Sequence, residues 1–185
     1  MAPFSERKTH RLHLGRISAS EVCYFITFVT SARKPWLNNP NNRQAALQVL
    51  SAWHEQGDSG ALLAATVMPD HVHVLCQLGS RYTVGQCVGR WKTEILREIH
   101  YAENWQRDFW EHRLREDESP EDYGLYTFLN PYRARLLRKD ESWPGWLIPE
   151  PRKFRFAAAL TVNGIPPPEW LDWPDTRFTG LSAGE

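Results

Sequence analysis

The chain has 185 residues, of which 42% are hydrophobic, and its 22 Lys/Arg and 22 Asp/Glu give a formal net charge of zero. This composition predicts a globular domain with a hydrophobic core and excludes disordered and fibrous proteins. Three scattered cysteines are too few for a disulfide framework or a Cys-x-x-Cys zinc site. The sequence shows neither the apolar core of a signal peptide nor a run long enough to span a bilayer, so we expect a cytoplasmic protein without membrane contact.

The charges are unevenly distributed along the chain. Residues 1–48 carry seven Lys/Arg against two acidic residues, and residues 123–155 carry seven against three. Residues 102–122 are acidic, with three Lys/Arg against eight Asp/Glu. The basic segments, including a basic N-terminal arm, suit contacts with nucleic acid, although ordinary solvated faces show similar patterns.

Hydrophobic patterns predict seven elements in chain order. Residues 23–30 are rich in aromatic and β-branched side chains and indicate a buried strand, and a helix follows the Asn-rich turn at 38–42 and ends near Gly57. Strands are predicted at 61–67 and 71–78, joined by the turn at Pro69-Asp70. Apolar residues at helical spacing predict a helix over 84–100, a further strand follows at 109–115, and Ser119-Pro120 begins the last helix.

This order predicts an α+β fold of the ferredoxin-like, split βαβ type. Its antiparallel sheet is expected to carry the helices on one face. We expect the domain to occupy residues 1–140. Residues 141–185, which contain several Trp and a Pro166-Pro167-Pro168 run, show little periodicity and predict an irregular tail.

Two pairs of residues suggest a functional site. His71 and His73 lie two apart in a predicted strand, so their imidazoles point the same way and form half of a metal site. Tyr126 and Asn130 lie four apart in the last helix, on one face. Together they suggest a mixed nitrogen and oxygen site for Mg²⁺ or Mn²⁺ that presents a phosphate to Tyr126.

Some of these residues have alternative interpretations. Asn130 precedes Pro131 and suits the N-cap of a helix that restarts there. Tyr123 is a rival nucleophile one turn before Tyr126. Asp70 suits a turn-stabilising role better than that of a base, and His112 a packing or substrate-facing role better than that of a ligand.

Four segments in this order resemble the REP-associated tyrosine transposases, which are HUH single-strand transposases with one catalytic tyrosine. They are Met-Pro-Asp-His-Val-His at 68–73, Val-Gly-Arg-Trp-Lys at 88–92, Phe-Trp-Glu-His at 109–112 and Tyr-Thr-Phe-Leu-Asn-Pro at 126–131. The resemblance spans about residues 10–140. It implies a ferredoxin-like nuclease domain in which His71, His73 and Asn130 hold a divalent Mg²⁺ or Mn²⁺.

The same resemblance implies an activity and a substrate. Tyr126 would attack a phosphodiester in single-stranded DNA, giving a 5′-phosphotyrosine link and a free 3′-hydroxyl. The family acts on short imperfect hairpins of repetitive extragenic palindromes (REP) flanked by a tetranucleotide, and we expect a monomer or a homodimer.

Expected DNA contacts are Arg11 and Arg16 in the basic arm and Arg90 and Lys92 on the second helix, with a solvated surface as the alternative. The tail is a candidate to fold back over the basic groove. The alternative function is a hairpin-binding module without turnover, in regulation or chromosome organisation. A water-using metal hydrolase is disfavoured because Asp70 is the only carboxylate near the His pair.

Overall fold

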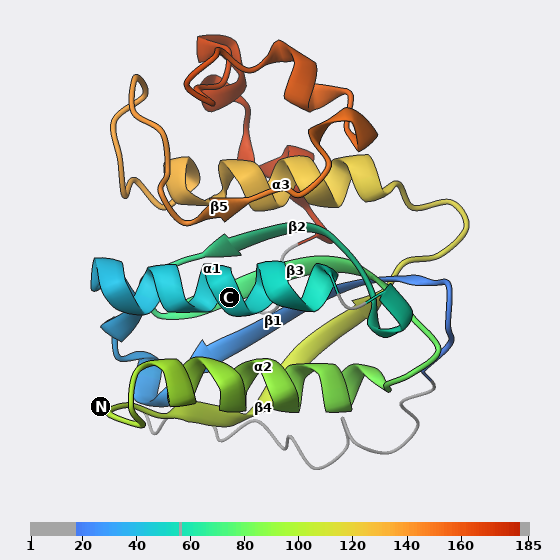
Figure 1. The fold of residues 1–185 in the computed structure, drawn as a ribbon. Helices are drawn as coiled ribbons and strands as arrows, with labels where there is room; N and C mark the ends of the chain where they lie inside the picture. The colour runs from blue at the N-terminus through green and yellow to red at the C-terminus, as the bar shows by residue number, and fades with distance from the viewer. Residues whose placement is uncertain (1–17, 56, 182–185) are drawn as a thin grey trace, which may run out of the picture.

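The structure, a computed structural model, describes residues 18–55 and 57–181 and is built around a five-stranded antiparallel sheet with the strand order β4-β1-β3-β2-β5 (Figure 1). The main elements are β1 (Cys23–Thr30), α1 (Pro40–His54), β2 (Gly60–Val67), β3 (His71–Leu78), α2 (Val84–Glu98), β4 (Trp105–Arg113), α3 (Pro120–Arg133) and β5 (Trp146–Leu147). The chain order βαββαβ with the spatial order 4-1-3-2 is that of a split βαβ sheet. The predicted α+β, ferredoxin-like class is confirmed.

The two central strands, β1 and β3, are covered on both faces. Side chains alternate along a strand, so Ile26 of β1 and Val74 of β3 belong to the core that faces α1 and α2. Phe25 and Leu75 belong to the core on the opposite face, under α3. This alternation directs His71 and His73 toward α3.

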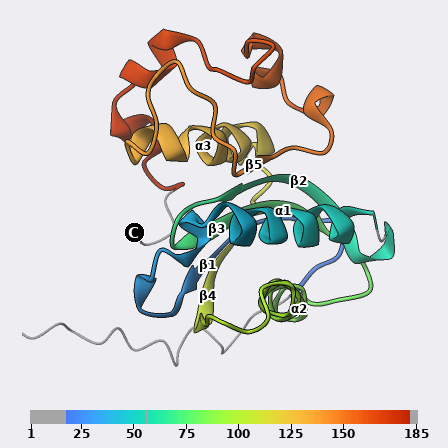
Figure 2. The same cartoon turned by 60° about the vertical axis from the view of Figure 1, so that its left-hand side comes forward.

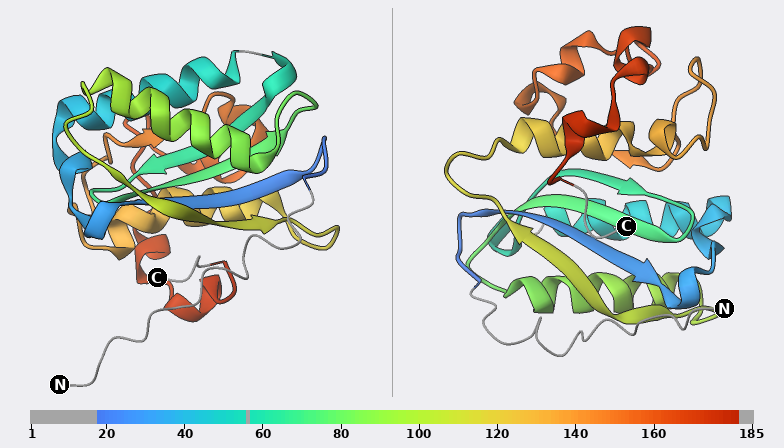
Figure 3. Two further views of the ribbon diagram at one scale, coloured as in Figure 1. Left: turned by 90° about the horizontal axis from the view of Figure 1, so that it is seen from below. Right: turned by 180° about the vertical axis from the view of Figure 1, so that it is seen from behind.

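Helices α1 and α2 lie on one face of the sheet, while α3 covers the other face, as Figures 2 and 3 show. The expectation that the helices share one face therefore holds for α1 and α2 only. Helix α3 differs from α1 and α2 in being covered on all sides, because all ten of its residues from Tyr123 to Tyr132 are buried. An amphipathic surface helix buries one stripe, whereas α3 is enclosed between the sheet and the C-terminal segment.

The segment after α3 packs against that helix. It contains β5, which pairs with β2, and several short 3₁₀ helices. Phe154, Phe156 and Phe178 are buried in the same core as α3. Sequence periodicity missed these elements because each is only two to five residues long. In the described part of the chain, no helix combines the length and apolar character needed to cross a membrane.

Candidate active site

The two histidines of β3 converge on one point under α3. His73 is fully buried and His71 is 8% exposed. Their Nε2 atoms lie 3.1 Å apart, and the two rings are nearly perpendicular. Metal–imidazole bonds are about 2.0–2.1 Å long, so two nitrogens at this separation can contact a single ion.

The other nitrogen of each ring is held by a neighbour. Thr27 of β1 is the register partner of His73, and its Oγ1 lies 2.8 Å from His73 Nδ1. His71 Nδ1 lies 2.7 Å from Asp70 Oδ1, and the tautomer that donates this hydrogen bond keeps its lone pair on Nε2. Metal-binding histidines have such outer partners, which fix the tautomer and the ring orientation.

Asp70 is in turn held by Arg33, whose Nη1 lies 3.1 Å from Asp70 Oδ2. The hydrogen bond from His71 lowers the pKa of Asp70; burial opposes this shift, and the charges of His71 and Arg33 add to it. The main chain of Asp70 also accepts from Thr30 N–H at 2.8 Å. The side chain of Asp70 thus contacts His71 and Arg33, and the main chain of Asp70 joins the turn to β1.

Helix α3 brings Asn130 to the histidine pair. Asn130 is 5% exposed, and its Nδ2 lies 3.3 Å from His73 Nε2. A half-turn of the amide places Oδ1 in this position. The helix continues through Pro131 to Arg133, so the alternative interpretation of Asn130 as the N-cap of a restarted helix is wrong.

Tyr126 lies one helical turn before Asn130, beside the ring of His73. The centroids of these two rings are 5.8 Å apart, and Phe25 of β1 packs against both rings. The Tyr126 side chain is fully buried. Phe178 covers it from the C-terminal segment, with ring centroids 5.8 Å apart, and the Arg133 guanidinium lies 5.2 Å from its centroid.

The convergent groups fit a divalent cation of the kind expected. Among the described residues no group of three or more His, Cys, Asp or Glu is placed to hold a metal ion, and the polar group that α3 adds beside the two imidazoles is the Asn130 amide. With its amide turned by half a turn, Asn130 would offer Oδ1 to a cation, and a set of two imidazoles and one amide would leave positions open for substrate oxygens. The outer partners Thr27 and Asp70 complete the fit.

Tyr123 is poorly suited to be the nucleophile. Its hydroxyl donates to Glu118 Oε1 at 3.2 Å. Burial raises the pKa of Tyr123, and the negative charge of Glu118 and this hydrogen bond raise it further. His112 lies 2.7 Å from the same carboxylate and stacks on Tyr123, which is the predicted packing role.

The residues expected to contact DNA differ in their surroundings. Arg90 is exposed, and its guanidinium lies 4.9 Å from the Tyr82 ring centroid. Lys92 Nζ instead donates to three main-chain carbonyls of β4, those of Gln106, Arg107 and Asp108. An ammonium group has three donors, so Lys92 is committed to joining α2 and β4, which argues against a phosphate contact. Arg11 and Arg16 lie outside the described residues.

Sequence patterns do not predict four residues that surround the site: Thr27, Arg33, Arg133 and Phe178. Thr27 reaches the site because the register of β1 and β3 pairs it with His73. The sequence pattern of two distant strands does not specify that register. Phe178 lies in the segment predicted to be irregular and reaches Tyr126 across 52 positions of sequence.

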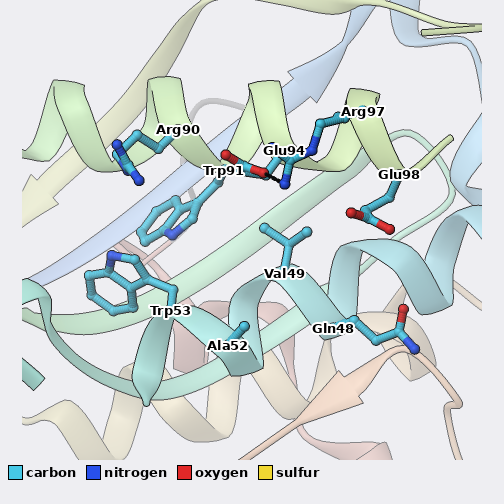
Figure 4. Close-up of a pocket in the computed structure, with 9 residues that line it drawn as sticks. All are labelled: Gln48, Val49, Ala52, Trp53, Arg90, Trp91, Glu94, Arg97 and Glu98. Atoms are coloured by element: carbon cyan, nitrogen blue, oxygen red, sulfur yellow. Dashed lines mark ion pairs between the residues drawn. The ribbon is translucent and has the colours of Figure 1, made fainter. Parts of the chain in front are cut away.

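A separate cavity lies between α1 and α2, on the opposite face of the sheet (Figure 4). It measures about 420 Å³, and the rings of Trp53 and Trp91 meet edge to face at its base. Arg97 and Glu94 form an ion pair on its rim. It lies across the sheet from the histidine pair, so Arg97 supplies a control position for experiments on the active site, whereas Arg90, an expected DNA contact, also lines this cavity.

The chain is similar to known proteins in both sequence and fold. Residues 18–117 match the family model described as "Transposase IS200 like". A Haemophilus influenzae protein named as a candidate REP-associated tyrosine transposase is 27% identical over 139 residues, which covers 65% of this chain and 76% of that protein. An Escherichia coli K12 REP-associated tyrosine transposase is 25% identical over 126 residues, covering 66% of this chain and 67% of that protein.

A solved structure shares the fold. It is described as a REP-associated tyrosine transposase bound to a REP hairpin, with a TM-score of 0.58 and 20% sequence identity over 86% of this chain and 88% of that chain. At this identity the likeness concerns the fold. Tyr126 and Asn130 lie beyond the residues that the family model matches.

Proposed function

Because the chain belongs to the IS200-like transposase family, we propose that it cleaves and rejoins single-stranded DNA with Tyr126 as the nucleophile. The observation that carries the proposal is the convergence of His71 Nε2, His73 Nε2 and the Asn130 amide beside the Tyr126 ring. This arrangement joins a strand and a helix that are far apart in the sequence. It provides a phosphate-binding centre next to a hydroxyl group.

The proposed reaction is a transesterification. The Tyr126 phenolic oxygen forms a bond to phosphorus, the bond from phosphorus to the 3′ oxygen breaks, and that oxygen leaves as a hydroxyl after taking up a proton. The product is a 5′-phosphotyrosine, and attack by a 3′-hydroxyl reverses the step. One phosphodiester replaces another, so ATP is not required.

His71, His73 and Asn130 would hold the cation, with Mg²⁺ or Mn²⁺ as the expected ions. A bound divalent cation supplies Lewis-acid polarisation and orientation of the phosphate. Thr27 and Asp70 fix the two imidazoles, which keeps their Nε2 atoms aimed at one point. Arg133 places a positive charge beside the Tyr126 ring, where the phosphate must arrive.

The proposed substrate is a REP-type hairpin with a flanking tetranucleotide. Support comes from the names of the two relatives and from the hairpin bound by the structural neighbour. Unpaired bases beside such a hairpin offer both phosphates and stacking surfaces for recognition. A monomer or homodimer is proposed for the assembly.

A hairpin-binding protein without turnover is the second candidate. It is favoured by the full burial of Tyr126 under Phe178, since a covered hydroxyl cannot reach a phosphodiester. Under this alternative the fold and the DNA surface are retained and the chemistry is not.

A covalent-adduct assay separates the two candidates. The protein is incubated with end-labelled hairpin DNA carrying single-stranded flanks and Mg²⁺ or Mn²⁺, then resolved on a denaturing gel. We expect a protein–DNA adduct with wild type and with Tyr123→Phe, and none with Tyr126→Phe. Hairpin binding without any wild-type adduct would support the second candidate.

A further inference from the structure

A basic and aromatic cleft lies at the C-terminal end of α3. It measures about 380 Å³ and is bounded by the end of α3, the loop that follows it and the C-terminal segment. Four cationic side chains line it: Arg133, Arg135, Arg138 and Lys139. We call it the α3 cleft. It is distinct from the centre formed by His71, His73 and Asn130, none of which lines it.

The charge of the α3 cleft suits an anion. No acidic side chain is among its lining residues in the described chain. Arg138 is paired with Asp140, and Lys139 with Asp172 at 2.6 Å, but all four side chains are more than half exposed. Exposed ion pairs contribute little to stability, so a phosphate can replace either carboxylate.

The cleft also offers a stacking surface. The rings of Trp170 and Trp173 are stacked, with centroids 5.4 Å apart and an interplanar angle of 23°. The Arg177 guanidinium lies 3.9 Å from the Trp173 centroid and covers that ring. Trp170 is half-buried against the core under α3, and among the described residues Trp173 is the only ring in contact with it, so the exposed part of the Trp170 ring can receive a further aromatic group. Unpaired bases stack on such rings irrespective of sequence.

The cleft connects directly to the candidate nucleophile. Arg133 lies 4.8 Å from the Phe178 centroid and 5.2 Å from the Tyr126 centroid, and both Arg133 and Phe178 line the cleft. A strand that occupies the cleft and continues toward Tyr126 would displace Phe178 from the tyrosine ring. The cleft and the catalytic centre are therefore adjacent sections of one path for the chain of nucleotides.

We propose that the α3 cleft binds one unpaired nucleotide of the single-stranded DNA next to the cleaved phosphodiester. Its phosphate lies between Arg135 and Lys139, and its base stacks on Trp170. The cleft volume is at the lower end of the range of about 300–1,000 Å³ for small-ligand sites, which suits a single nucleotide and not a duplex. This assignment rests on the proposed function, because it takes Tyr126 as the point of cleavage.

At Arg135 the contribution of the guanidinium group to DNA binding can be tested without destabilising the backbone. It lies in the turn after α3 with a φ of 55°, a left-handed conformation in which glycine is usually favoured. Its guanidinium pairs with no acidic side chain among the described residues. Arg135→Gly therefore removes the charge and relieves the backbone, so a loss of binding cannot be attributed to a destabilised turn.

The experiment measures fluorescence anisotropy in the Tyr126→Phe background, where no adduct forms. Two probes are used: a labelled DNA hairpin with single-stranded flanks and the same hairpin with blunt ends. We expect Trp170→Ala to weaken binding of the flanked hairpin by roughly fivefold to a hundredfold, with little change for the blunt one. Trp170→Phe should restore most of the affinity, because it retains an aromatic face.

Arg135→Gly should weaken binding of the flanked probe. It should also reduce the slope of log affinity against log salt concentration by about 0.7, which corresponds to one phosphate contact on a single strand. Arg97→Ala, on the opposite face of the sheet, is the matched control and should change neither probe. The proposal is overturned if the Arg135→Gly and Trp170→Ala variants bind the flanked probe with the affinity of the parent protein. It is also overturned if both variants lose affinity for the flanked and the blunt probe by the same factor. If the variants lose affinity for the flanked probe alone, but the wild-type protein forms no adduct, the proposed chemistry is overturned and the assignment of the cleft is retained.

Discussion

Phe178 packs against the ring of Tyr126, with the two centroids 5.8 Å apart, and the tyrosine is fully buried beneath it. The C-terminal segment thus covers the side chain that we propose as the nucleophile. The two residues are brought together only by the folding of the segment onto α3. We therefore expect access to Tyr126 to depend on this contact.

Removing the Phe178 ring should therefore increase activity. We expect Phe178→Ala to accelerate adduct formation severalfold in single-turnover assays with flanked hairpin DNA. Phe156→Ala is the matched control, because Phe156 is buried in the same core but packs on Phe128 and Trp146 and not on Tyr126. Equal rates for Phe178→Ala and wild type, with both proteins folded, would show that the contact does not limit access.

The hydroxyl of Thr27 should tune metal affinity through His73. Thr27→Val removes the group 2.8 Å from His73 Nδ1 and should weaken Mn²⁺ binding by roughly tenfold to a hundredfold in calorimetric titrations. Thr66→Val is the control, since Thr66 pairs with His73 from the β2 side and its buried hydroxyl has no hydrogen-bond partner among the described residues. Similar losses in both variants would contradict the orienting role.

Lys92 should matter for stability and not for DNA affinity. Lys92→Met removes three donors to β4 carbonyls and should lower the free energy of unfolding by about 1–3 kcal/mol in urea titrations. Hairpin affinity per folded molecule should stay unchanged. Arg90→Ala provides the comparison, because Arg90 is exposed and its removal should cost little stability. Weaker DNA binding by the folded Lys92→Met variant would support the phosphate contact that the sequence predicts for Lys92.

Glu118 should give the fold an acid-sensitive contribution. Burial favours a raised pKa for Glu118, but hydrogen bonds from Arg115 N–H, His112 and Tyr123, together with the charge of His112, outweigh this and hold it below the usual range. A carboxylate with a lowered folded pKa stabilises the protein above its unfolded pKa of about 4.3 and loses this contribution as the pH falls through the folded value.

Glu118→Gln should consequently reduce the free energy of unfolding by about 1 kcal/mol at neutral pH. The difference from wild type should shrink as the pH falls below about 4, and denaturant titrations across this range measure it. A difference that is constant with pH would assign the effect to packing and not to the charge.

Much of the fold was predictable because its elements have strong local signals. The aromatic and β-branched content of β1, the apolar run of β3 after the Pro69-Asp70 turn and the helical spacing in α2 placed these elements within two residues of their observed bounds at each end. Strand β4 begins four residues earlier than expected, at Trp105, whose ring packs on Phe28 and Trp36. That start is set by tertiary packing and has no local signal.

The site was predictable where spacing fixes direction. His71 with His73 on a strand, and Tyr126 with Asn130 on a helix, needed only the periods of the two elements. Thr27, Arg33 and Phe178 could not be found because they meet the site through strand register and long-range packing. The side of the sheet that α3 covers was missed for the same reason.

Mass spectrometry tests most directly whether Tyr126 is the nucleophile. The wild-type protein is allowed to react with flanked hairpin DNA and Mn²⁺, and the products are digested with nuclease and protease before the measurement. We expect a nucleotide linked through a phosphodiester to the peptide containing Tyr126, with fragmentation that places it on that residue. A nucleotide on Tyr123 or on any other side chain would contradict the assignment. So would an unmodified Tyr126 peptide under conditions in which the DNA is cleaved.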